Sequence, residues 1–412
     1  MTGSDYLSQA WTDYRDELER IRKKMFEAIG VDAEMETATA WYLFHEIQTA
    51  AFNVAFAPRL DAPRFFVHGI FEPTAYGHTS PGCDYFYRKA FIDPTKRYRI
   101  WGKRSNSHMM TMQVMGGYWT APKADAKDLG TYDFDQLKND DGTFELIVSP
   151  TEPETGIWVN TAGASESPCL MVREFFYDWV NEETSELHIE LLDERPGSPV
   201  HSGPELARRY KLAVNFIRIA IEDFSIPRVP VAIERVGVNN FDDAYFDAKH
   251  NNAGRNRWTG FLVAGYRVKQ DEALIITMRD LDARYWGIQL SDRWHQTNDY
   301  IEHQSSLNGH QAIVDPDGAI RFVVAHSDPG IANWLDAMGI EFGGIDLRYI
   351  TSPKPNENLD FSKDTRPVLK TELVALADVG RRLSGLTATV TPQERLSSLA
   401  ARRKGALRRC GY

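Results

Sequence analysis

A short stretch in the C-terminal half carries side chains that can transfer protons. Asn308 and His310 come before the tetrapeptide DPDG at 315–318, and His326 comes after it. In this tetrapeptide Pro occupies a turn position that it favours, and Gly occupies the position that needs a positive φ. Apolar and β-branched residues flank the turn, so the sequence predicts a β-hairpin over residues 307–326.

The geometry of this turn decides whether the two histidines meet. If a type I turn with a Gly bulge joins the strands, Asn308 faces His326. His310 then lies diagonal to His326 on the same face, with the α-carbons about 7–8 Å apart. If the loop is a plain two-residue turn, the two imidazoles point to opposite faces. Only the first alternative predicts a site.

Histidine titrates near neutral pH and can serve as a general acid or base. A neighbouring carboxylate would orient the imidazole and raise its pKa, and Asp328 follows His326 closely. We therefore predict His310, His326 and Asp328 as the catalytic residues. The alternative is that both imidazoles only satisfy backbone groups at a sheet edge.

The residues around this hairpin are rich in aromatic and amide side chains, although the pattern predicts strands. A buried polar group without a partner costs roughly 2–7 kcal/mol, so a polar sheet face is either a wet surface or the lining of a site. We predict a site in which Gln289 and Asn308 position a substrate while Trp286 and Trp334 pack against it. The alternative for Trp334 is that it caps the core.

A metal site is an alternative interpretation of the same residues. His326 and Asp328 match the first half of the facial triad of non-haem iron oxygenases. That pattern needs a histidine further downstream, but His326 is the last of the 11 histidines. We therefore predict no metal. The motifs GxSxG, GxxxxGKS/T, GxGxxG and HExxH are absent as well, and we expect no cofactor.

The formal net charge is −11, which disfavours nucleic acid as a partner. Basic residues cluster near the C-terminus and predict a solvated helix face. The alternative is that this face contacts an acidic surface of a second subunit in a homo-oligomer. Three widely spaced cysteines indicate a reducing compartment. A charged start unlike a signal peptide and the lack of a long apolar run predict a cytoplasmic protein without a membrane partner.

Short aromatic and β-branched segments separated by turn signals run through two long parts of the chain. Such spacing predicts antiparallel sandwich or jelly-roll sheets. The fold class that we predict is α+β, mainly β, with two antiparallel β-sandwich or jelly-roll-like domains and N-terminal, central and C-terminal helices. The predicted helices cover residues 5–29, 35–56 and 203–223 and a last segment that starts at the capping box of Thr391 and Glu394.

These patterns divide the chain into five parts: an N-terminal helical region (1–60), a first β-rich domain (61–200), a connecting helix (201–233), a second β-rich domain (234–350), and a linker with a basic helical tail (351–412). Within them, the segment IPRVP at 226–230 predicts a stiff extended connector. The Asn-rich residues 238–256 predict a long loop.

Several segments resemble a bacterial family known as domain of unknown function 1214, whose members often carry a neighbouring domain of unknown function 1254. The resemblance covers most of residues 60–350, and the strongest segments are DEALIITMRDLDARYWGIQL at 271–290 and SSLNGHQAIVDPDGAIRFVVAHSDPGIANWLDAMG at 305–339. Weaker segments lie at 79–104, 141–150 and 172–179. The resemblance implies two β-rich domains of sandwich or jelly-roll type with added helices, and it implies no reaction.

The functional hypothesis is a cofactor-independent enzyme of hydrolase or lyase type. It would act on a small organic, glycan-like or apolar metabolite in a groove of the second β-rich domain. The alternative is a ligand-binding or scaffold protein that uses the same groove without chemistry. A non-haem metalloenzyme is the third and least favoured hypothesis.

Overall fold

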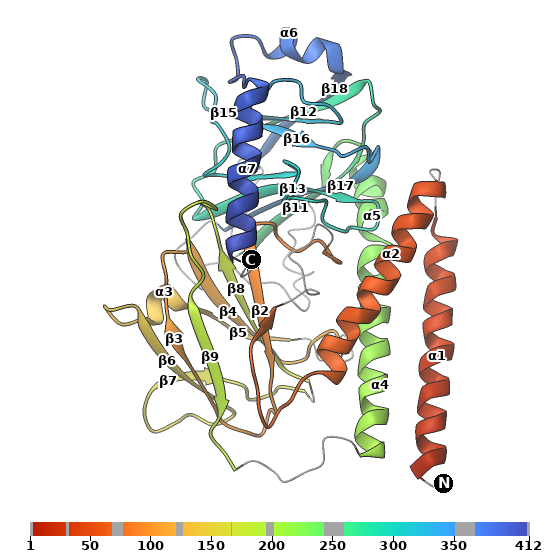
Figure 1. The fold of residues 1–412 in the computed structure, drawn as a ribbon, viewed down its shortest axis with the longest axis vertical. Coiled ribbons are helices and arrows are strands. Elements are labelled where there is room, and N and C mark those ends of the chain that lie inside the picture. Colours follow the sequence, from red (N-terminus) through yellow and green to blue (C-terminus); the bar gives the residue numbers. More distant parts are fainter. Residues whose placement is uncertain are drawn as a thin grey trace.

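The computed structural model describes residues 3–29, 33–67, 77–120, 127–165, 167–194, 202–242, 259–350 and 367–409. Two β-sandwich-like units are stacked end to end, and long helices run along one side of the stack (Figure 1). The predicted pair of sandwich domains with helices is therefore confirmed. Helices contribute about as much of the chain as strands do, so "mainly β" overstated the strand content.

The first sandwich consists of two sheets with the strand orders β1-β2-β8-β4-β5 and β7-β6-β3-β9. Alternate residues such as Ala90, Met112 and Val172 point between the sheets and form an apolar core. The bounds are β1 Phe66–Val67, β2 Tyr85–Phe91, β3 Tyr98–Lys103, β4 Met109–Met115, β5 Asp128–Asp133, β6 Thr143–Ser149, β7 Ile157–Asn160, β8 Cys169–Phe175 and β9 Glu186–Leu191, with the short helix α3 at Phe134–Leu137.

The second sandwich has the strand orders β10-β11-β17-β13-β14 and β16-β15-β12-β18. Its core holds side chains such as Trp286, Ile288 and Phe322 between the two sheets. The bounds are β10 Phe241–Asp242, β11 Thr259–Arg267, β12 Glu272–Arg279, β13 Tyr285–Asp292, β14 Ser306–Asn308, β15 Ala319–Ala325, β16 Trp334–Asp336, β17 Phe342–Ile350 and β18 Val368–Ala375.

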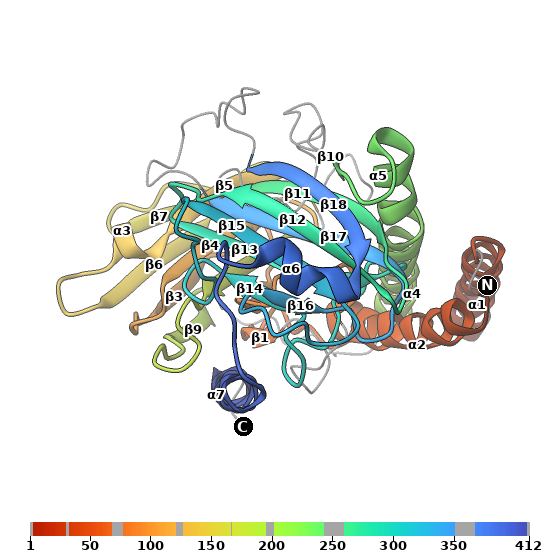
Figure 2. The ribbon, with the colours of Figure 1, turned by 90° about the horizontal axis from the view of Figure 1, so that it is seen from above.

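A helical layer covers part of the outer face of the first sandwich (Figure 2). It contains α1 (Gly3–Glu27), α2 (Ala33–Ala51) and α4 (Gly203–Arg218), as the sequence predicts. The π-helical turns Phe52–Phe56 and Ile219–Ser225 continue α2 and α4, so the helical segments extend close to their predicted ends. The shared core of this layer includes Phe44, Phe91 and Phe216.

Two predicted connectors contain regular structure instead. The predicted extended connector at 226–230 was wrong, because α5 spans Arg228–Val236. Pro230 lies in the first turn, where its missing N–H has no intrahelical acceptor to lose, so the proline is tolerated. Strand β18 lies in the part that was predicted as linker and helical tail, and it pairs with β12. Residues 243–256 of the predicted loop and 351–366 of the predicted linker lie outside the described residues.

The last helix, α7 (Pro392–Arg409), runs across the seam between the two sandwiches (Figure 1). The predicted capping box is confirmed, since the Glu394 amide donates to Thr391 Oγ1 at 3.2 Å and the Thr391 amide donates to Glu394 Oε2 at 2.7 Å. Before it, α6 (Val379–Leu383) follows a 3-10 turn at Leu376–Asp378 and packs on the outer face of the second sandwich.

The basic tail was predicted as a solvated helix face, and this is correct only in part. Arg403, Lys404 and Arg408 are exposed, but Arg402 and Arg409 are buried inside the same chain. In the described residues, no helix combines the length and the apolar character that crossing a membrane requires.

Candidate functional site

The sheet that contains β13 and β17 has one apolar face and one polar face. Its apolar face belongs to the sandwich core, and the alternation of side chains places Gln289, Asp346 and Arg348 on the other face. All three are at least nine-tenths buried. This polar face meets the first sandwich, so it forms a buried junction between the two units and not a wet surface.

Residues 77–84 of the first unit cover the junction. Ser80 Oγ donates to Asp346 Oδ2 at 2.6 Å, and Gln289 Nε2 donates to Ser80 Oγ at 2.8 Å. Arg348 donates to Gln289 Oε1 at 2.6 Å and also to the Ser80 carbonyl. The Cys83 amide completes the contact at 3.1 Å from Gln289 Oε1. Charged and amide groups from both units are thus joined in one hydrogen-bonded network.

Asp84 anchors the neighbouring part of the junction. Its carboxylate accepts from Trp179 Nε1 at 2.8 Å, from Tyr285 Oη at 2.8 Å and from Asn308 Nδ2 at 2.7 Å. Buried carboxylates need such donors because the desolvation of a charge is costly. These bonds tie strand ends of the second unit to the first unit.

The turn after β13 is the most unusual local structure in the junction. All seven residues of DRWHQTN at 292–298 are buried, although most of them are polar. Asp292 Oδ1 accepts the amides of Trp294 and Gln296, both at 2.9 Å, and holds the turn closed. His295 has a φ of 59°, which a residue with a side chain rarely adopts. Such backbone strain recurs at functional sites.

The turn directs His295 onto Asp346. His295 Nε2 lies 3.0 Å from Asp346 Oδ2, and both side chains are almost completely buried. Although burial favours the neutral acid, the donors from His295 and Arg348 hold the pKa of Asp346 well below its ordinary value. Burial lowers the pKa of His295, and the charges of Arg228 and Arg348 act in the same direction against the opposing effect of Asp346.

This arrangement leaves a proton acceptor on the imidazole. A neutral His295 next to an ionised Asp346 carries its proton on Nε2, because only that tautomer donates to the carboxylate. Nδ1 then carries a lone pair, and it has no hydrogen-bond partner in the described residues. Burying an acceptor without a donor costs free energy of folding. Nδ1 is therefore suited to accept a hydrogen bond from a ligand or to remove a proton from it.

The first sandwich also carries buried polar side chains on one face of a sheet. Lys89 and Arg173 project from β2 and β8 on the face of the sheet that also holds Tyr85. Lys89 Nζ donates to Tyr118 Oη, and burial lowers the pKa of Lys89 to about 7. Arg173 donates to Gln113 Oε1 at 2.9 Å. The outer face of the first sandwich, which the helical layer covers in part, therefore also carries basic groups.

The predicted meeting of His310 and His326 is wrong. The turn itself is as expected: the Asp315 amide donates to the Ala319 carbonyl at 2.8 Å, and Gly318 has a φ of 80°. The strands on either side do not pair with each other, however. β14 pairs with β13 in one sheet, and β15 pairs with β12 and β16 in the other, so the predicted hairpin does not form.

The predicted catalytic residues are consequently dispersed. The His310 side chain is 54% exposed and lies 3.9 Å from Asp178 Oδ2. His326 Nε2 lies 2.8 Å from the Val268 carbonyl, which corresponds to the alternative of a backbone contact. Asp328 forms an ion pair at 2.9 Å with Arg395 on α7 and does not orient either imidazole.

The predicted binding residues divide into two pairs. Trp286 belongs to the sandwich core, and Trp334 caps the outer face of the second sandwich with its Nε1 donating to the Ala325 carbonyl at 3.0 Å. Neither faces the junction network. Gln289 and Asn308 both lie in the junction, where they contact Ser80 and Asp84 respectively. The structure therefore places only these two near the candidate site.

The residues that the sequence analysis missed are His295, Asp346, Arg348 and Ser80. They come from three separate parts of the chain, and no short motif joins them. One signal was present: Asp346 and Arg348 alternate with apolar residues along a strongly apolar strand, which indicates two different faces. In the described residues, no group of three or more His, Cys, Asp or Glu side chains is placed to hold a metal ion.

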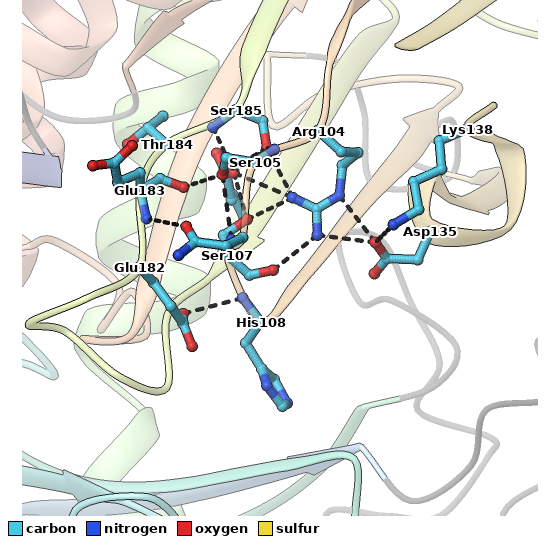
Figure 3. A network of polar contacts seen from close by, with 12 residues as sticks. Arg104, Ser105, Ser107, His108, Asp135, Lys138, Glu182, Glu183, Thr184 and Ser185 are labelled. Carbon is cyan, nitrogen blue, oxygen red and sulfur yellow. Dashed lines mark hydrogen bonds and ion pairs between the residues drawn. The ribbon is translucent and has the colours of Figure 1, made fainter. Parts of the chain in front are cut away.

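A separate polar network in the first unit has a structural character (Figure 3). Arg104 lies against Asp135 and donates to Ser107 Oγ at 2.6 Å and to Ser185 Oγ at 2.8 Å. The buried Glu174 accepts from both serines. Because these partners satisfy one another at the ends of strands, the network joins loops of the first unit.

Comparisons with known proteins agree with this fold and name no activity. No protein-family model matches the sequence, and no curated protein matches it. The crystal structure of an uncharacterised protein from Burkholderia cenocepacia is similar over 92% of this chain and 100% of its own, with 25% identity and a TM-score of 0.76. A protein from Vibrio parahaemolyticus covers 81% of this chain and 98% of its own, with 11% identity and a TM-score of 0.45.

Proposed function

We propose that the junction between the two sandwiches binds a small organic anion and that His295 transfers a proton to or from it. The reaction class is hydrolysis or elimination without a cofactor. The observation that carries this proposal is the buried His295–Asp346 pair, whose imidazole keeps an acceptor without a partner in the described residues. This replaces the groove around His310 and His326 as the location of the chemistry.

The substrate class follows from the charges around His295. Arg228 and Arg348 both lower the pKa of His295, so their positive charges act on the imidazole. A buried cluster of cations favours an anionic ligand, because a carboxylate or phosphate can accept several charge-assisted hydrogen bonds.

Access to the site requires movement. His295 is 2% exposed, so a ligand reaches Nδ1 only when the surrounding backbone opens. Closing over a substrate excludes water and strengthens the electrostatic contacts inside the site. Because the site must open first, we expect ligand binding to be slow. We also expect the backbone amides of the junction to be protected from hydrogen exchange when a ligand is bound.

The first step of the test is a thermal-shift series with succinate, citrate and phosphate, with glucose as the neutral control. The anions are expected to raise the melting temperature and glucose is not. Proton NMR then detects whether a stabilising anion is converted. His295→Gln is the informative variant because its amide can keep the contact with Asp346 while Nδ1 is lost. We expect binding to survive and conversion to fall at least 100-fold.

The control is His310→Gln, which should convert at the wild-type rate. Equal stabilisation by glucose, or undiminished conversion in His295→Gln, would contradict the proposal. Stabilisation by an anion without conversion would favour the second candidate, a ligand-binding protein without chemistry.

Three earlier expectations stay predictions. The relationship to the family known as domain of unknown function 1214 is supported by the segments at 271–290 and 305–339. A cytoplasmic location is supported by the buried free thiols of Cys83 and Cys169. Assembly into a homo-oligomer also stays a prediction.

A further inference from the structure

A cleft of about 400 Å³ lies outside the junction, at the end of the helical layer. Asn53 and Ala57 line it where α2 and its π-helical turn end, and Phe66 and Phe91 line it from β1 and β2. Clefts that hold small molecules have volumes of roughly 300–1,000 Å³, so this one has room for a compact ligand with one or two rings.

The two phenylalanines give the cleft an apolar wall. Their ring centroids are 6.0 Å apart with an interplanar angle of 18°, which is a stacked arrangement. Phe91 is buried and anchored in the core shared with α2 and α4, whereas Phe66 is only partly buried. A flat apolar ring of a ligand could extend this stack, because aromatic pairs favour offset stacking at such distances.

The remaining lining supplies positive charge. Arg59 and Arg64 line the cleft, and among its described lining residues none is acidic. Arg59 forms an ion pair at 2.9 Å with Asp61, so its charge is largely compensated. Arg64 is exposed, and the structure pairs it with no carboxylate in the described part of the chain. The cleft thus combines an aromatic wall with the guanidinium of Arg64, which pairs with no carboxylate among the residues that the structure describes.

We propose that this cleft binds a small aromatic carboxylate, with the ring against Phe66 and the carboxylate on Arg64. A guanidinium presents paired N–H donors that match the two oxygens of a carboxylate. The apolar wall discriminates against short aliphatic acids, and the cation discriminates against neutral aromatics. The proposal is independent of His295, because none of the cleft residues belongs to the junction network.

The test uses 1-naphthoate as the probe and 1-naphthalenemethanol as its neutral counterpart, in titration calorimetry with the full-length protein. We expect 1-naphthoate to bind at least tenfold more tightly than the alcohol. Arg64→Ala should weaken 1-naphthoate binding about tenfold or more while the alcohol is unaffected, since charge-assisted hydrogen bonds account for changes of this size. Arg64→Lys should restore part of the affinity.

Arg15→Ala is the matched control, because Arg15 is an exposed arginine on α1 that does not line the cleft, and this variant should bind as the wild type does. Phe66→Ala should weaken both probes and so locate them in the cleft. Three results would overturn the proposal: no binding of 1-naphthoate at millimolar concentration, equal affinity for both probes, or affinity that is unchanged in both Arg64→Ala and Phe66→Ala.

Discussion

At the scale of single residues, the buried carboxylates of the junction differ in their ionisation because their donors differ. Asp346 faces His295 and Arg348, and it stays ionised. Asp292 accepts only from backbone amides and from the Gln296 side chain. Burial is therefore the dominant influence and raises the pKa of Asp292 to about 6. The protein therefore keeps the carboxyl group of Asp346 ionised and favours the protonated form of Asp292.

Asp292 provides a prediction about pH. Its pKa is about 6 in the folded protein against an ordinary value of 3.8 for an aspartic acid, so the folded state binds an extra proton between these values. As the pH rises from 4 to 7, the free energy of unfolding of the wild type therefore falls by about 3 kcal/mol relative to that of Asp292→Asn. Urea unfolding of both proteins across this range measures the difference. A difference that is constant with pH would contradict the shift.

At the scale of elements, α7 acts as a clamp through a stripe of buried arginines. Arg395, Arg402 and Arg409 recur at heptad spacing and face the protein. Arg402 donates to the Tyr300 carbonyl at 2.6 Å and lies over the Trp179 ring, 4.1 Å from its centroid. Residue Trp179 belongs to the first sandwich unit and Tyr300 to the second, so one side chain joins both.

This clamp predicts a contrast between two adjacent arginines. Arg402→Ala should reduce the free energy of unfolding by about 3 kcal/mol, because it leaves buried acceptors without donors and removes packing on Trp179. Arg403→Ala is the control. Arg403 pairs with Glu302 on the surface, where both side chains are more than half exposed, so about 0.5 kcal/mol is expected. Denaturant titration compares them, and equal losses would refute the clamp.

At the scale of the whole molecule, the two sandwiches interlock closely enough to behave as one body. Arg284 of the second unit pairs with Asp133 and Asp135 of the first, at 2.5 and 2.8 Å. At the junction, Gly287 leaves no room for a side chain: an added Cβ would lie 2.7 Å from Asp84 Oδ2 and 2.5 Å from Tyr285 Oη. This close fit is kept only if the two units do not move relative to each other.

Gly287 therefore tests the coupling of the units. Gly287→Ala should lower the melting temperature, with a cost of about 1–3 kcal/mol from displaced junction groups. Gly380→Ala in α6 is the control, since no atom lies within 4 Å of its added Cβ, and alanine should stabilise that helix by about 0.5–1 kcal/mol. Calorimetry should show one transition in the wild type. A wild type with two separate transitions would contradict the interlocking.

The amino-acid sequence by itself determined the local elements. Alternating apolar residues predicted most of the strands, capping residues such as Thr391 predicted a helix start, and DPDG predicted a turn in which Asp315 faces Ala319. These features depend on neighbouring residues, and their physical causes act over a few positions. The density of polar residues in this region also predicted Gln289 and Asn308 as site residues, and both lie in the junction.

Only the tertiary structure decided which sheet each strand joins. Alternation defines the two faces of a strand, but the partner strand is chosen by contacts between residues far apart in the chain. For this reason the strands around DPDG entered different sheets and separated His310 from His326. The same long-range pairing brought Ser80, His295 and Asp346 together from distant segments, and the buried carboxylate of Asp346 thereby gained donors in addition to the nearby Arg348.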